Sequence, residues 1–117
     1  MESKNTVLKK YNLPNSLVEF LQGDKLKIEI TNDKYCKFIR FYSYQGTVET
    51  KWKRKKVLSL VAEVDNYSVV DIVWHPDKQM IYAIDTEHET FTSLASWEEF
   101  YMNMEKYILA YLNGEKE

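Results

Sequence analysis

The chain has 117 residues, 44% of them hydrophobic and 29% charged, with a formal net charge of −2; since a chain of this length buries roughly two-thirds of its unfolded surface, residues 1–117 are expected to form a single domain. Cys36 is the single cysteine, which excludes an internal disulfide, and no apolar run approaches the roughly 20 residues that cross a bilayer. Because the first residues also lack the apolar core of a secretory signal, the expected location is cytoplasmic.

Two short helices are predicted at the start of the chain. The first covers residues 6–11 and the second residues 13–21. Pro14 favours the first turn of the second helix, and Gly23 ends it. One face of this helix is apolar, with Leu17, Phe20 and Leu21.

Strands follow in the middle of the chain. Apolar and polar residues alternate over residues 25–30, which predicts a half-buried strand. Further strands are predicted at residues 35–44, 47–52, 57–64, 67–74 and 79–85, with a short edge strand at 90–94. Gln45-Gly46 is predicted to make a hairpin turn, and Asp65-Asn66 and residues 75–78 are also predicted turns. The expected fold class is therefore α+β, with a mainly antiparallel sheet of five or six strands and helices from both termini packed against it.

The last element is an amphipathic helix that begins at a capping box. Ser96 is the cap and Glu99 lies three residues later. The Ser96 hydroxyl can therefore accept a hydrogen bond from the backbone N–H of Glu99, and the Glu99 carboxylate can accept one from the backbone N–H of Ser96. Apolar residues then recur at steps of three and four, which places them on one helix face: Trp97, Phe100, Tyr101, Met104, Tyr107, Ile108, Tyr111 and Leu112. This stripe is expected to be core, and Gly114 is expected to stop the helix.

Two segments resemble a known family. One is Leu13-Pro14 with the helix that ends near Phe20-Leu21, and the other is the strand at residues 81–85 followed by the Leu94-Ala95-Ser96-Trp97-Glu98-Glu99-Phe100 segment. Together they resemble the SUKH superfamily, which contains bacterial toxin-immunity proteins and fungal cell-wall synthesis regulators. This chain departs from the family at residues 75–79, where a Gly-rich turn is common. The resemblance implies a partner-binding role, no catalytic residues and no cofactor.

Charge is divided unevenly along the chain. Residues 25–56 hold ten basic and three acidic groups, a net of +7, whereas residues 57–117 hold three basic and twelve acidic groups, a net of −9. The leading hypothesis is an immunity-type protein that binds and neutralises a partner toxin by occluding its active site, for example a nuclease, which is cationic where it receives phosphates. The predicted contact residues are Asp65, Asp71, Asp77, Asp85, Glu87 and Glu89.

The basic run supports an alternative. Its residues are Lys51, Trp52, Lys53, Arg54, Lys55 and Lys56. Five cations around one aromatic suit a nucleic-acid-binding module that tracks phosphates and stacks a base. The same run also fits an acidic protein partner or a solvated turn.

A third hypothesis is a small hydrolase. It would use the carboxylates and the histidine of residues 85–89 together with His75, provided that these groups converge. No metal site is predicted, because no cluster of His or Cys completes one. Cys36 is expected to be a buried small apolar residue. Nine Tyr and three Trp exceed what the core needs, so some are expected at a binding surface.

Overall fold

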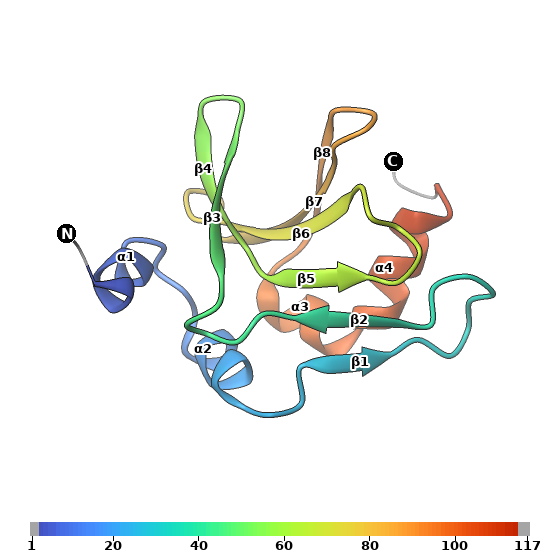
Figure 1. Cartoon of the computed structure of the whole chain (residues 1–117), viewed down its shortest axis with the longest axis horizontal. Coiled ribbons are helices and arrows are strands. Elements are labelled where there is room, and N and C mark those ends of the chain that lie inside the picture. The colour runs from blue at the N-terminus through green and yellow to red at the C-terminus, as the bar shows by residue number, and fades with distance from the viewer. Residues whose placement is uncertain (1–2, 115–117) are drawn as a thin grey trace.

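The computed structural model describes residues 3–114 and contains four helices and eight strands (Figure 1). The N-terminal elements are α1 (Lys4–Lys9), α2 (Asn15–Gln22), β1 (Lys27–Glu29) and β2 (Phe38–Phe41). The middle contains β3 (Val48–Trp52), β4 (Lys55–Ser59), β5 (Val61–Val64) and β6 (Val70–His75). The chain continues with β7 (Met80–Asp85), β8 (Thr90–Ala95), α3 (Trp97–Met102) and α4 (Met104–Leu112). The predicted limits of the domain, residues 1 and 117, lie outside the described residues.

The predicted α+β class and the antiparallel pairing are confirmed. All strand pairs are antiparallel, and the strands form two sheets, with the orders β1-β2-β5 and β3-β4-β6-β7-β8. The structure has eight strands in two sheets, whereas five or six strands in one sheet were predicted. The strand expected at residues 57–64 is divided into β4 and β5, which lie in different sheets. Gln45-Gly46 also makes no hairpin, since β2 and β3 lie in different sheets.

Leu60 is the residue at which the chain passes from one sheet to the other. Its N–H donates to the carbonyl oxygen of Ile72 at 3.0 Å, and its own carbonyl oxygen accepts from the N–H of Tyr42 at 2.8 Å. The first bond joins it to β6 and the second to the end of β2. The strand therefore keeps its hydrogen bonds while it changes partners.

The closing helix is also divided, at Asn103, whose φ of −134° and ψ of 39° lie outside the helical region. The Ser96 cap is confirmed, because its hydroxyl accepts from the N–H of Glu99 at 3.3 Å. The Glu99 carboxylate accepts from the Asn103 side-chain amide at 3.0 Å. The predicted stripe nevertheless holds across the break, except that Tyr101 is 55% exposed.

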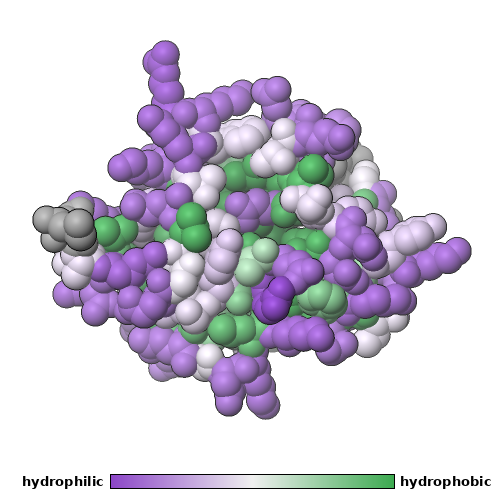
Figure 2. Space-filling view, in the orientation of Figure 1, coloured by the Kyte–Doolittle hydropathy of each residue, from purple (hydrophilic) through white to green (hydrophobic). Residues whose placement is uncertain are grey.

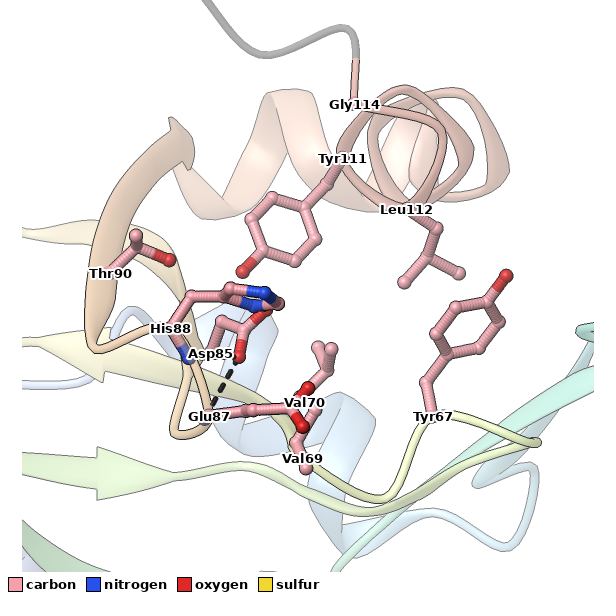
Figure 3. A pocket seen from close by; sticks show the side chains of 10 residues that line it. All are labelled: Tyr67, Val69, Val70, Asp85, Glu87, His88, Thr90, Tyr111, Leu112 and Gly114. Carbon is pink, nitrogen blue, oxygen red and sulfur yellow. Dashed lines mark hydrogen bonds and ion pairs between the residues drawn. The ribbon is translucent and has the colours of Figure 1, made fainter.

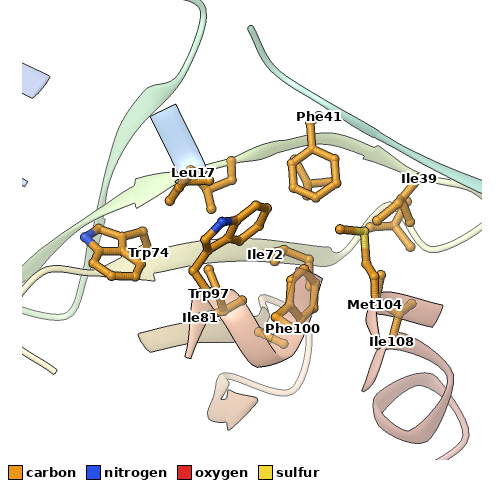
Figure 4. Packing of buried hydrophobic residues seen from close by; sticks show 14 of the residues in the cluster. Leu17, Ile39, Phe41, Ile72, Trp74, Ile81, Trp97, Phe100, Met104 and Ile108 are labelled. Carbon is orange, nitrogen blue, oxygen red and sulfur yellow. The ribbon is translucent and has the colours of Figure 1, made fainter. Parts of the chain in front are cut away.

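The main core lies between the two sheets and the C-terminal helices (Figure 4). Trp97 and Phe100 from α3 meet Phe41 from β2 there, and Ile72 and Ile81 contribute from the five-stranded sheet (Figure 4). The ring of Phe20 packs edge-on against Phe41 with centroids 4.9 Å apart. Cys36 is fully buried, as predicted. Among residues 3–114, no helix is both long and apolar enough to cross a membrane.

Trp74 bonds the segment directly after α1 to the five-stranded sheet. Its indole N–H donates to the backbone carbonyl oxygen of Tyr11 at 2.8 Å, and both residues are buried. A buried carbonyl that loses its donor keeps the cost of its desolvation. The contact between Trp74 and Tyr11 therefore stabilises the fold in two ways, by packing of the indole ring and by a hydrogen bond to a buried carbonyl oxygen.

We expect Trp74→Phe to lower the free energy of unfolding by about 1–3 kcal/mol, because it removes the indole N–H and part of the packed ring. Urea denaturation followed by circular dichroism measures this. Trp52→Phe is the matched control: Trp52 is half-buried, and the change is expected to cost less than about 1 kcal/mol. Equal losses in the two variants would show that the bond to Tyr11 is unimportant.

Candidate functional site

Two hairpins, β3–β4 and β7–β8, rise next to each other from the same side of the molecule (Figure 1). The turn of the first contains Lys53 and Arg54, and the turn of the second contains Glu87 and Glu89. Hydrophilic side chains gather over this side in Figure 2, with apolar ones visible below them. We call the two elements the basic hairpin (residues 48–59) and the acidic hairpin (residues 80–95).

The acidic hairpin is organised by Asp85. Its Oδ1 accepts hydrogen bonds from the backbone N–H groups of Glu87 and His88, both at 3.0 Å, and its Oδ2 lies 2.9 Å from the Nδ1 of His88. The backbone and side-chain bonds from His88 hold the pKa of Asp85 below its usual range. Asp85 is therefore engaged within the turn, whereas Glu87 and Glu89 are exposed.

A pocket of about 550 Å³ opens beneath this hairpin (Figure 3). Tyr111 enters it from α4 and points toward His88 and Thr90, while Tyr67 stands on the opposite side (Figure 3). Val70 and Leu112 add apolar wall. Burial is the main cause that raises the pKa of Tyr111, so the phenol is protonated at neutral pH. The pocket is a mainly apolar hollow with charged groups on its hairpin side.

The hydrolase hypothesis is wrong in the form that required His75. His75 pairs with Met80 at one end of β7, and Val70 pairs with Asp85 at the other end. Five residues of extended strand separate these ends by roughly 17 Å. Among residues 3–114, no group of three or more His, Cys, Asp or Glu side chains is arranged to hold a metal ion.

The other three predicted acidic residues lie apart. Asp65 accepts from the backbone N–H of Lys37 at 2.9 Å at the end of β5. Asp71 accepts from the Ser59 hydroxyl at 2.7 Å on the five-stranded sheet, on the face that points away from the main core. Asp77 pairs with Lys55 in the β6–β7 turn. Only Asp85, Glu87 and Glu89 share one element.

The basic run is divided between two faces of its hairpin. Lys51 lies directly opposite Lys56, and Trp52 lies opposite Lys55. Because side chains alternate along a strand, Lys51 and Lys56 share one face and Trp52 and Lys55 share the other. Lys53 has a φ of 56° in the two-residue turn.

Trp52 belongs to an aromatic cluster that the sequence did not indicate. Its ring stacks on Phe91 with centroids 5.8 Å apart, and Phe91 stacks on Tyr82 at 4.4 Å. Trp52 and Phe91 come from the two edge strands of the five-stranded sheet, which would be roughly 19 Å apart in a flat sheet. The sheet therefore curls, and a small second core of Val57, Val73 and Ile84 lies under the rings.

His75 closes the same cluster, with its ring 5.2 Å from that of Tyr82. Burial is the main cause that lowers its pKa, with Lys55 and Lys78 adding to the effect. The imidazole is therefore neutral at pH 7 and acts as a packing residue. The continuous apolar run from Met80 to Ile84 in β7, which allows both faces of the strand to be covered, is the sequence feature that agrees with this second face.

No protein-family model, curated protein or solved structure matches the chain. The resemblance to the SUKH superfamily stays a prediction from its short motifs. Function is therefore inferred from the two hairpins and the surfaces beside them.

Asp71 gives a pH-dependent prediction, because burial raises its pKa above the ordinary value. A carboxyl with a raised pKa in the folded state stabilises the fold when protonated, and this contribution is lost as the pH rises through the folded-state pKa. We therefore expect Asp71→Asn, which keeps an acceptor for Ser59, to be more stable than the parent at pH 7. The gain should vanish below the unfolded pKa of about 4.

Thermal denaturation between acid and neutral pH measures this difference. Asp77→Asn is the control, because it removes a carboxylate that is exposed and paired with Lys55, and it is expected not to stabilise the protein at any pH. A lower melting temperature for Asp71→Asn at pH 7 would contradict the assignment.

Proposed function

We propose that the chain is an immunity-type protein, which binds and neutralises a cationic partner toxin by covering its active site. The observation that carries the proposal is the acidic hairpin, in which Asp85 orders the turn and leaves Glu87 and Glu89 exposed. A nuclease is the toxin that this charge fits best, since its phosphate-binding cleft is cationic. The proposal includes a cytoplasmic location and no catalytic activity of the chain itself.

Preorganisation supports this role. The bonds from Glu87 and His88 to Asp85 define the turn before a partner arrives, so little backbone entropy remains to be lost on binding. Exposed carboxylates on a projecting turn also attract a cationic partner over roughly 10 Å at moderate salt and raise the association rate. Binding at such a turn is expected to be fast and sensitive to salt.

The pocket under the hairpin offers an anchor. Tyr67 and Tyr111 present aromatic rings within it, and Glu87 lies at its rim (Figure 3). An arginine or lysine side chain from the partner could stack on a tyrosine ring and pair with the carboxylate. Tyrosine and arginine are enriched among the residues that dominate the binding energy of protein interfaces.

The nucleic-acid alternative receives less support from the arrangement of the basic run. It required cations and a stacking ring on one surface. Trp52 faces away from Lys51 and Lys56 and stacks on Phe91, and Lys55 pairs with Asp77. A single strand could not contact that ring and those two lysines on the same face.

Co-expression tests the proposal. We expect the chain to rescue growth of cells that express the toxin encoded by a neighbouring gene. Rescue by a stoichiometric inhibitor should depend on the level of the chain and should be accompanied by a complex that copurifies. Failure to neutralise any toxin encoded nearby would contradict the immunity role.

The contact surface is tested with the double variant Glu87→Lys and Glu89→Lys. We expect its association rate with the toxin to fall by roughly tenfold at low salt, and by less as salt screens the charges. Stopped-flow fluorescence measures the rates. The matched control, Glu19→Lys with Asp24→Lys, changes the total charge equally at exposed positions of the α2 region and should leave the rate close to that of the parent.

A further inference from the structure

The face of the basic hairpin that carries Lys51 and Lys56 borders a groove of about 480 Å³. Its other walls come from Val7 of α1, from Lys10 and Tyr11 directly after that helix, and from the hairpin turn, with Arg54. The groove lies away from the acidic hairpin and its pocket. It was not apparent from the sequence, because α1 is 40 residues or more from the basic run.

Like charges oppose each other in this groove. Lys51 and Lys56 are direct cross-strand partners on one face, an arrangement that destabilises an antiparallel pair. Within residues 3–114, neither of them, nor Arg54, forms an ion pair. The remaining cation of the run that borders the groove, Lys55, pairs with Asp77.

Among residues 3–114, one carboxylate lines the groove and reduces its charge only in part. Glu49 accepts a hydrogen bond from the hydroxyl of Tyr11 at 2.6 Å. Burial and this bond raise the pKa of Tyr11, so the phenol keeps its proton and continues to donate to Glu49. Within the described part of the chain, the cations Lys51, Arg54 and Lys56 against the carboxylate of Glu49 leave a net charge of +2 in the groove.

We propose that this groove is a binding site for a small oligophosphate. Phosphate oxygens would accept from the planar guanidinium of Arg54 in a two-bond arrangement, and Lys51 and Lys56 would contribute ammonium groups on either side. A bound anion turns the repulsion between the two lysines into attraction toward a shared centre. The site is distinct from the acidic hairpin and does not rest on the proposed function.

The arrangement of the aromatic residues decides the class of ligand. A nucleic-acid strand needs a ring on which a base can stack, beside the cations. Trp52 is on the opposite face against Phe91, and Tyr11 is engaged with Glu49. The groove therefore recognises phosphate charge without a base, which favours a compact oligophosphate over a polynucleotide.

Tripolyphosphate is the probe, titrated into the full chain at about 50 mM salt by calorimetry, with amide chemical shifts to locate the site. We expect the double variant Lys51→Gln with Lys56→Gln to weaken binding by roughly tenfold or more. The matched control, Lys25→Gln with Lys34→Gln, removes two exposed cations elsewhere and should bind like the parent. Absence of tripolyphosphate binding, or equal weakening in both double variants, would overturn the proposal.

Thermal stability gives a second measurement that shows whether the variant folds. Without ligand, Lys51→Gln with Lys56→Gln should melt at a higher temperature than the parent, because the repulsion is removed. Tripolyphosphate should raise the melting temperature of the parent and the control but not that of this variant. A variant that melts lower than the parent would contradict the role assigned to the lysine pair.

Two further probes show which class of anionic ligand the groove prefers. A single-stranded oligonucleotide and a short polyglutamate peptide are titrated under the same conditions. We expect both to bind more weakly than tripolyphosphate at equal concentration of anionic groups. Tighter oligonucleotide binding that is lost in Trp52→Ala, or polyglutamate binding equal to that of tripolyphosphate, would overturn the assignment to an oligophosphate.

Discussion

The two backbone hydrogen bonds of Leu60 are the constraint on which the architecture depends. Because its N–H bonds to β6 and its carbonyl to the end of β2, one continuous stretch of chain supplies a strand to each sheet. The residues around it, from Val57 to Val61, are all buried. A break without these bonds would leave polar backbone groups unsatisfied in the core, so the passage between sheets has to occur where both partners are within reach.

The order of strands in the five-stranded sheet also determines where the basic and acidic residues lie on the surface. The basic hairpin supplies the first two strands of the five-stranded sheet and the acidic hairpin supplies the last two. The two hairpins therefore form the opposite edges of that sheet. The sheet curls until Trp52 and Phe91 stack, which brings the edges toward each other. The uneven charge of the sequence thus becomes two projecting elements of opposite sign on one side of the molecule (Figure 1).

The two hairpins treat their charges differently. In the acidic hairpin, Asp85 is satisfied by the turn itself, and the exposed carboxylates are held on an ordered loop. In the basic hairpin, Lys51 and Lys56 remain opposed without an acidic partner among residues 3–114. The first is a preorganised surface and the second carries an electrostatic conflict. Natural proteins retain such locally unfavourable arrangements chiefly at functional sites.

Much of the fold was predictable where the signal is local. The Ser96 cap, the helical stripe and the strand at β7 follow from residues that interact with near neighbours in the chain. The break at Asn103 and the exposure of Tyr101 were not predicted, because the stripe has the same spacing on both sides of the break. Of the six predicted acidic contacts, three fall on one hairpin, and their grouping follows from the short turn between β7 and β8.

By itself, the sequence determined the α+β class, the antiparallel pairing, the amphipathic end of the chain and the opposite charges of its two halves. Each of these depends on the period of apolar residues or on composition, which local geometry converts directly into structure. Only the tertiary structure decided that residues 57–64 serve two sheets, that Trp52 turns away from its lysines, and that α1 makes a groove with the basic hairpin. Those features depend on contacts between residues far apart in the chain, and no local pattern encodes which distant surface a strand or ring will meet.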